Sequence, residues 1–246
     1  MPVCLEVEPH LNIVSSGTPA RGLSQADACA ELKKHIDDGR ITIRKPRDKS
    51  DEPYDPEPGK RVEVKLADVC GIRLTPANAD AKNWKWTNGL DLRMAVLLCR
   101  FLEFLKDKWE ATEVYWGGLG VPGQQEVQDA HSKGCAMDFH GAQTECGSFM
   151  VERDWGLRLV PGAGKSNIWP LNAKKFSFRL DPTTPAGMFF HHVYDYLTTQ
   201  AHDAAGHPWG RTTIGMPSYI IHPDHPGSPE KRRKHRNHIH FEVPWR

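Results

Sequence analysis

The sequence predicts an α+β fold, in which a small antiparallel sheet is flanked by helices and preceded by an N-terminal extension. Helical patterns at residues 88–109 and 185–199 are interspersed with short strand-like runs, without the regular strand–helix alternation of a doubly wound fold. Hydrophobic residues make up 39% of the chain and charged residues 26%, as in ordinary globular proteins. A chain of 246 residues is also long enough to bury a substantial core.

The N-terminal part is expected to contain short strands, one helix and a linker. Strand-like runs at residues 4–7 and 11–14 precede a helix predicted over residues 24–38, with Ser24 at its N-cap. Residues 45–60 are charged and rich in proline, which predicts an exposed loop and the best candidate for a boundary.

The remaining elements should form the body of the fold. Alternation over residues 61–66 predicts a strand, and the chain is expected to be irregular from there to residue 86. Apolar residues at three- and four-residue spacing over residues 88–109 predict a helix with a wide apolar face, and proline near its start marks a second helix over residues 185–199. Further strands are expected over residues 112–116, 135–139, 218–221 and 238–243.

Charge and hydropathy argue against two classes of partner. The chain has 32 Lys and Arg against 31 Asp and Glu, so a net charge of +1 gives no global attraction to nucleic acid or to an anionic membrane surface. No stretch approaches the ~20 apolar residues that span a bilayer, and the first residues resemble no secretory signal. We therefore expect a chain made in the cytoplasm and without a membrane span.

The six cysteines form no CxxC pair and leave the compartment open. Cys135 and Cys146 flank one predicted strand and would bridge in an oxidising environment. Buried free thiols are the alternative.

Residues able to carry chemistry lie in two distant segments. In the first, His131 and Asp138 converge if the chain turns back at Gly134, whose backbone permits such a turn. In the second, His238 and His240 point to the same face of a strand. A hydrolytic zinc (Zn2+) site needs three protein ligands and an open position for water, and His131, Asp138 and His240 supply these ligands. His238 would act beside them as a catalytic proton acceptor or charge stabiliser.

These segments carry a resemblance to a known family. The matching positions are His131-x-x-Gly134-x-Ala136-x-Asp138, His238-x-His240, Tyr115-Trp-Gly117-Gly118 and Asp154-Trp155. The pattern resembles the zinc peptidase superfamily of lysostaphin, D-Ala-D-Ala carboxypeptidases and hedgehog proteins, and within it the extensin-like and murein-endopeptidase branches. The resemblance covers about residues 114–243.

The resemblance implies a zinc peptidase domain over residues 84–246, preceded by an extension or subdomain of unknown role over residues 1–83. It also implies the same three ligands and gives His238 the catalytic place. Two positions depart from the pattern: many relatives have serine where this chain has Asp129, and others have Glu-x-x-His where this chain has His238-x-His240. The second departure favours an endopeptidase-like arrangement.

Other residues compete for a role in the site, although each also has a plainer structural explanation. They are the cluster of His222, Asp224 and His225, His140 on the face of Asp138, the carboxylates Glu145, Glu152 and Asp154, and the basic run at residues 231–236. The basic run would either steer an anionic glycan or form a solvated loop. His191 and His192 lie on a predicted helix, where one of the two should face outward.

The function implied by the resemblance is hydrolysis of an amide bond in the stem peptide or cross-link of bacterial peptidoglycan, by an endopeptidase or a carboxypeptidase. Without a recognisable signal, such an enzyme would be an antibacterial toxin injected by a type VI secretion system, or a phage lysis endopeptidase. Both would act in the periplasm or cell wall after non-standard export, with an immunity or delivery protein as partner of residues 1–83. The competing interpretation is a non-enzymatic, zinc-stabilised binding module of the hedgehog kind.

Overall fold

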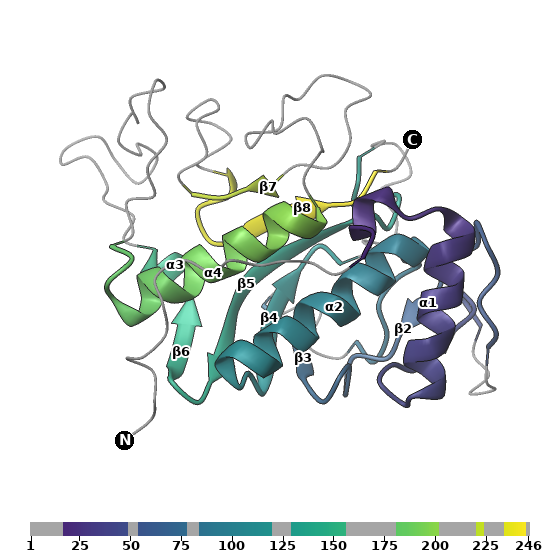
Figure 1. Cartoon of the computed structure of the whole chain (residues 1–246), viewed down its shortest axis with the longest axis horizontal. Helices are drawn as coiled ribbons and strands as arrows, with labels where there is room; N and C mark the ends of the chain where they lie inside the picture. Colours follow the sequence, from purple (N-terminus) through teal and green to yellow (C-terminus); the bar gives the residue numbers. More distant parts are fainter. Residues whose placement is uncertain are drawn as a thin grey trace.

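The fold combines a mixed six-stranded sheet with a two-stranded sheet and several helices, as the computed structural model in Figure 1 shows. The residues described are 17–48, 54–77, 84–119, 129–155, 181–201, 220–223 and 234–244. Within them the expected α+β class is confirmed. The predicted strands at residues 4–7 and 11–14 lie outside this part of the chain.

The large sheet has the strand order β3-β4-β5-β8-β7, and β6 also pairs with β5. Its strands are β3 (Arg73–Pro76), β4 (Glu113–Gly117), β5 (Ala136–Thr144), β6 (Gly147–Met150), β7 (Ile220–Ile221) and β8 (Ile239–Glu242). The four strands predicted from residue 112 onward correspond to β4, β5, β7 and β8. The C-terminal strand β8 therefore lies inside the sheet, between β5 and β7 (Figure 1).

The prediction that the sheet is antiparallel is wrong at one edge. Strands β3 and β4 are parallel, with Leu74 opposite Val114. Helix α2 (Leu92–Trp109) connects them, and a helical crossover of this kind returns the chain in its original direction. A short strand that ends in Pro76 gives only a weak alternation pattern, which explains why the sequence did not reveal it. The region before residue 84 thus supplies an edge strand of the large sheet.

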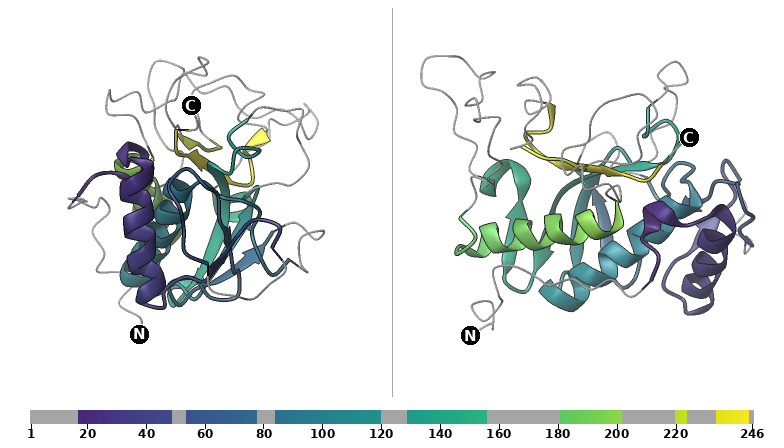
Figure 2. Two further views of the ribbon diagram at one scale, coloured as in Figure 1. Left: turned by 90° about the vertical axis from the view of Figure 1, so that its right-hand side faces the viewer. Right: turned by 45° about the horizontal axis from the view of Figure 1, so that its top comes forward.

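The longer helices form a layer on one side of the large sheet. Helix α1 (Gln25–Asp37) packs against α2, and α2 packs against α4 (Pro185–Gln200). Figure 2 shows these helices on one side and the strands on the other. The smaller elements are η1 (Ala20–Gly22), α3 (Val151–Asp154), β1 (Ile43–Arg44) and β2 (Glu63–Val64).

Aromatic side chains fill the space between α2 and the sheet. The ring of Phe101 packs edge-on against Phe139 of β5, at 5.3 Å between centroids, and against Phe241 of β8, at 5.4 Å. All three side chains are fully buried, and such pairs contribute roughly 0.5–1.5 kcal/mol beyond the burial of their area. Because side chains alternate along a strand, this packing turns Asp138 and His240 to the opposite face.

Helix α4 matches its predicted range within one residue but is more deeply buried than expected. His191 and His192 are both buried, so the prediction that one of them faces outward is wrong. The ring of His192 packs at 5.4 Å from that of Trp109 on α2. Most of the circumference of α4 is buried, so neither histidine lies on a solvent-exposed face.

The cysteines next to β5 do not bridge each other. Cys135 is a buried free thiol, as one alternative held, whereas Cys146 is disulfide-bonded. Burial raises the pKa of the Cys135 thiol to about 12, which makes it unreactive at neutral pH.

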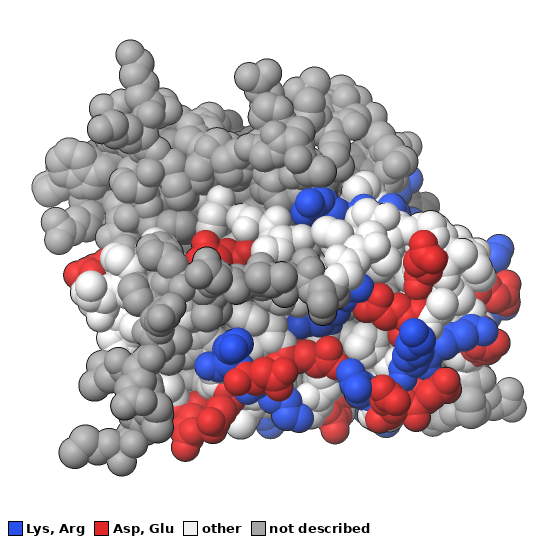
Figure 3. Space-filling view, viewed as in Figure 1, with Lys and Arg blue, Asp and Glu red and all other residues white. Residues whose placement is uncertain are grey.

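None of the helices among the described residues is long and apolar enough to cross a membrane. On the helical face drawn in Figure 3, acidic and basic side chains are interspersed. The described residues visible on this face therefore form no large patch of a single charge.

Helix α2 begins at Leu92 rather than at residue 88, because Asp91 caps it. The Asp91 carboxylate accepts a hydrogen bond from the Arg93 backbone N–H at 2.9 Å, and the Asp91 N–H donates to the Gly134 carbonyl at 2.9 Å. The start of the core helix is thus hydrogen-bonded to the turn that follows His131.

The N-cap of α1 is Ser24, as predicted.

Replacing Asp91 with alanine should lower the free energy of unfolding by about 1 kcal/mol, within the 0.5–2 kcal/mol range for loss of an N-cap. Urea unfolding followed by circular dichroism measures this change. Lys108→Ala, at an exposed position of the same helix, is the control and should change stability by less than about 0.5 kcal/mol. Equal effects of both substitutions would contradict the capping role.

Candidate metal centre

A tight turn presents His131 to the sheet. The Asp129 carboxylate accepts a hydrogen bond from the Ser132 N–H at 2.8 Å, and the Gly134 N–H donates to the His131 carbonyl at 2.9 Å. Gly134 has a φ of +71°, and a Cβ there would lie 2.1 Å from the Gly89 carbonyl oxygen. The glycine predicted for this turn is therefore required both by backbone conformation and by packing.

The other two predicted ligands come from paired strands. Asp138 on β5 lies directly opposite His240 on β8 in the antiparallel ladder. Ile239 and Phe241 flank His240 and are fully buried on the core side. The alternation expected for residues 238–243 is thus observed, and it directs His240 away from the core.

The structure brings His131, Asp138 and His240 together, as the sequence predicted. His131 Nε2 lies 3.1 Å from His240 Nδ1 and 3.4 Å from Asp138 Oδ1, and His240 Nδ1 lies 3.0 Å from the same oxygen. The three side chains are 20%, 18% and 8% exposed. This group could hold a metal ion, and no other such group occurs within the described ranges.

The ring of His131 is oriented by the chain that leaves β4. Its Nδ1 lies 2.5 Å from the Gly118 carbonyl oxygen. A carbonyl only accepts, so Nδ1 carries the hydrogen and Nε2 of the neutral ring keeps its lone pair toward Asp138 and His240. Gly118 is one of the positions that resemble the family pattern, but its residue type alone does not indicate this role. Every residue has a backbone carbonyl, so a hydrogen bond to one cannot be predicted from the residue type.

Only glycine fits at position 118. Its φ is +60°, and a Cβ there would lie 2.6 Å from His131 Cε1 and 2.7 Å from Asp138 Oδ2. Any side chain would therefore push against two of the three candidate ligands.

The charges within the group are strongly coupled. Burial disfavours the charged form of His131, but the hydrogen bond and charge of Asp138 outweigh this effect and raise the His131 pKa to about 9. Burial alone would raise the pKa of Asp138, yet hydrogen bonds from His131 and His240 and the nearby histidine charges hold it well below its usual range. At neutral pH the metal-free group therefore carries a proton on His131 beside an ionised Asp138.

His238 lies beside this group, as predicted for a catalytic residue. Its Nε2 is 3.4 Å from Asp138 Oδ1, its Nδ1 is 2.9 Å from Asn237 Oδ1, and its side chain is 12% exposed. Burial, with smaller contributions from neighbouring histidines, lowers the His238 pKa to about 4. The ring is therefore neutral at pH 7 and able to accept a proton.

His140 approaches the site because β5 carries a bulge. Tyr115 of β4 pairs with Gly141, but the next residue, Trp116, pairs with Phe139, so His140 is the extra residue. Bulges of this kind re-aim a side chain. His140 is partly buried, and burial lowers its pKa.

His235 is a neighbour of the site that the sequence interpretation treated only as part of the basic run. Its ring centroid lies 4.8 Å from that of His238 and 5.7 Å from that of His240. The turn at residues 235–237, immediately before β8, brings it there. The spacing of three residues between His235 and His238 is the feature of the sequence that could have indicated its place near the site.

None of the remaining candidates from the sequence is placed in the metal centre: each is packed in the core, hydrogen-bonded elsewhere or exposed, or lies outside the described residues. His222 is buried and stacks on Trp155 at 5.5 Å between ring centroids. Asp154 accepts a hydrogen bond from the Met150 N–H at 2.7 Å, and Glu145 and Glu152 are exposed. The positions outside the description are Asp224, His225 and residues 231–233 of the basic run.

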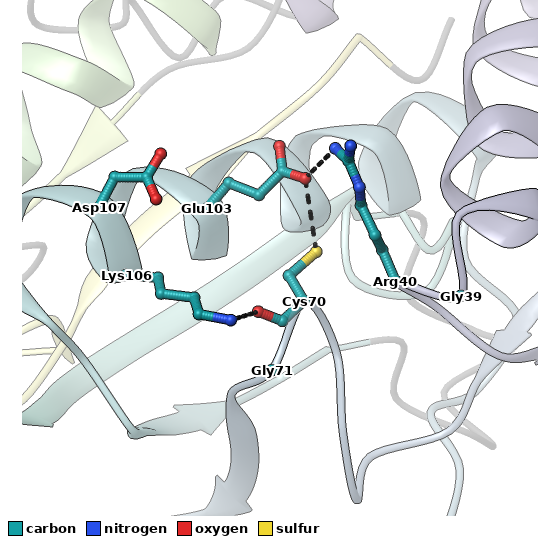
Figure 4. A pocket seen from close by; sticks show the side chains of 7 residues that line it. All are labelled: Gly39, Arg40, Cys70, Gly71, Glu103, Lys106 and Asp107. Carbon is teal, nitrogen blue, oxygen red and sulfur yellow. Dashed lines mark hydrogen bonds and ion pairs between the residues drawn. The ribbon is translucent and has the colours of Figure 1, made fainter.

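A separate hollow of about 490 Å³ lies where α2 meets the turn that contains Cys70 and Gly71 (Figure 4). Three of the charged side chains that line it, Arg40, Glu103 and Lys106, are engaged within the protein. Arg40 forms an ion pair with Glu103 at 2.6 Å, and Lys106 donates to the Cys70 carbonyl at 3.1 Å. We assign no ligand to it.

Comparison with known protein families, curated proteins and solved structures finds no match for this chain. The class of the site therefore rests on its own residues and geometry. These define a His–Asp–His group able to hold a metal ion, with a further histidine beside it.

Binding of a divalent cation, tested with Zn2+, should release about one proton near pH 7. His131 must be neutral to act as a ligand, and its raised pKa of about 9 means that the metal competes with a proton below that pH. The apparent Kd should rise about tenfold for each unit of pH lost between pH 9 and pH 7. Calorimetry in buffers of different ionisation enthalpy measures the proton, and a pH-independent affinity would contradict the prediction.

Gly118→Ala should abolish binding of Zn2+ to the folded protein, because its Cβ would displace His131 and Asp138. The matched control is Gly39→Ala, which has a similar φ of +69° but open space at the Cβ position. Both variants carry the backbone cost, roughly 1 kcal/mol, but only the first should lose the metal. Metal content after dialysis measures the difference, and full retention by Gly118→Ala would show that the close approach is unimportant.

Proposed function

We propose that this protein is a zinc-dependent peptidoglycan peptidase that uses His131, Asp138 and His240 as ligands and His238 as its catalytic residue. The observation that supports it most is the triangle of donor atoms, with edges of 3.0, 3.1 and 3.4 Å. Zinc bonds to nitrogen and oxygen are about 2.0–2.2 Å long, so neighbouring ligand atoms lie about 3–3.5 Å apart. The triangle fits one face of such a coordination sphere.

The residue types favour zinc in a catalytic rather than a structural site. Imidazole suits zinc and other late transition metals, whereas magnesium and calcium prefer oxygen ligands. Structural zinc sites are closed by four protein ligands, while catalytic ones have three and leave a position for water or substrate. Among the residues that the structure describes, this group has three members.

His238 is placed to move a proton at such a site. When bound, zinc would polarise a substrate carbonyl and lower the pKa of water. The Nε2 of His238, 3.4 Å from Asp138 Oδ1, faces this region and would take the proton of the attacking water. The same nitrogen would then return the proton to the amine that leaves.

The peptide part of peptidoglycan is the substrate class implied by the resemblance described above. The spacing of the His131–Asp138 and His238–His240 segments resembles that of the superfamily, and the observed group includes His131, Asp138 and His240. We propose that the enzyme acts on the cell wall, outside the cytoplasmic membrane. The disulfide at Cys146 is consistent with an oxidising setting.

The alternative, a zinc-stabilised binding module, does not require His238. A proton acceptor 12% exposed and directed at a ligand carboxylate has no part in holding a structural ion. This observation favours the enzyme over the module.

Zinc-loaded protein should release peptides from purified peptidoglycan sacculi. His238→Ala should keep its zinc but lower the rate by about 10²- to 10⁴-fold, the usual contribution of a general acid–base group. Asp138→Ala should lose both zinc and activity, whereas Lys108→Ala, on the exposed side of α2, should lose neither. Mass spectrometry of the released muropeptides and metal analysis provide the two measurements.

The outcomes separate the two classes of protein. Peptide release that vanishes in His238→Ala while zinc remains bound supports the peptidase. Full zinc occupancy without any release from sacculi by the wild type would contradict it and favour the binding module.

A further inference from the structure

The two ring nitrogens of His238 face two different oxygens. Its Nδ1 lies 2.9 Å from Oδ1 of Asn237, and its Nε2 lies 3.4 Å from Oδ1 of Asp138. An amide oxygen only accepts hydrogen bonds, so the hydrogen of the neutral ring belongs on Nδ1. The lone pair on Nε2 is then directed at the metal centre, where a proton acceptor is needed.

His140 lies beside both Asn237 and His238. The backbone of Asn237 is close enough to the His140 ring to raise its pKa against the effect of burial, and the ring centroid lies 5.3 Å from that of His238. The bulge on β5 carries His140 to this position. Gly117 leaves room for the ring, because a Cβ there would lie 2.8 Å from His140 Nε2.

We propose that Asn237 is a positioning residue that fixes the tautomer and ring direction of His238, and that His140 holds Asn237 in its place. This inference rests on the proposed peptidase function, in which His238 is the base. In this role Asn237 acts through His238.

The N–H of a largely buried imidazole ring needs a hydrogen-bond acceptor. Without the acceptor at position 237, a ring that is 12% exposed would leave its Nδ1–H without that partner. The ring would then favour the Nε2–H tautomer, whose hydrogen would point at the Asp138 carboxylate. A histidine protonated on the nitrogen that faces the substrate cannot act as a base.

The first test observes the tautomer directly and needs no substrate. In zinc-loaded protein labelled with ¹⁵N-histidine, long-range ¹H–¹⁵N correlation spectra should show His238 as the Nδ1–H tautomer. Asn237→Leu, which keeps the size but removes the acceptor, should shift it toward the Nε2–H form. Asn237→Asp, which keeps an acceptor oxygen, should retain the wild-type tautomer.

The second test is kinetic and uses soluble muropeptide dimers as the probe. Asn237→Leu should lower kcat by about 10- to 100-fold, as loss of an orienting partner does at metal sites, with KM unchanged. Asn237→Asp should recover most of kcat. Lys108→Ala, at an exposed position of α2, is the control and should leave kcat and KM unchanged.

Zinc content and thermal unfolding exclude trivial causes, since each variant should stay folded and metal-loaded. An Nε2–H tautomer of His238 in the wild type, or the same tautomer in wild type and Asn237→Leu, would overturn the inference. If the wild type releases no peptide, the proposed function fails, but the spectra still decide the role of Asn237. If the wild type is active and Asn237→Leu retains full kcat, only the positioning role fails.

Discussion

The antiparallel pairing of β5 with β8 is the constraint on which the candidate site depends. It places Asp138 opposite His240, although 102 residues separate them in the chain. A slip of one residue in this ladder would turn His240 toward the core. Such a slip is opposed on the other face, where Phe139 and Phe241 both pack against Phe101. Hydrophobic packing on one face of the sheet therefore sets the geometry of the polar group on the other.

Much of this arrangement is predictable because it follows from local rules. The alternation of residues 238–243 shows which histidines share a face, and Gly134 marks the turn that returns the chain toward Asp138. The long apolar stripe of α2 likewise predicts the core helix, although a capping residue, Asp91, sets its start later than the stripe implies. These features depend on residue type and spacing, which the sequence displays.

Other features depend on tertiary contacts and are invisible in the pattern. The parallel strand β3 has too few residues to show alternation, and only the crossover through α2 gives it a place in the sheet. The bulge that extends His140 toward the site arises from a shift of register between β4 and β5. The carbonyl of Gly118 orients His131 through an atom that every residue possesses. Residue types therefore identified the ligands but not the groups that orient them.

The site also shows how similar surroundings give two histidines different roles. Both His131 and His238 place Nδ1 against an oxygen, from Gly118 and Asn237 respectively, and both direct Nε2 at Asp138. A single carboxylate cannot stabilise a charge equally on every ring around it. The hydrogen bond with Asp138 raises the His131 pKa to about 9, whereas burial and the neighbouring histidines lower that of His238 to about 4.

This division matches the separate demands of binding and catalysis. The buried Asp138 carboxylate stabilises the proton on His131. The same negative charge would attract a divalent cation bound at the Nε2 of His131, where the cation replaces that proton. His238, which the same surroundings keep neutral, retains a lone pair for proton transfer. The hydrogen bond of Asp138 with one ring and the burial of the other thus distinguish a ligand from a base.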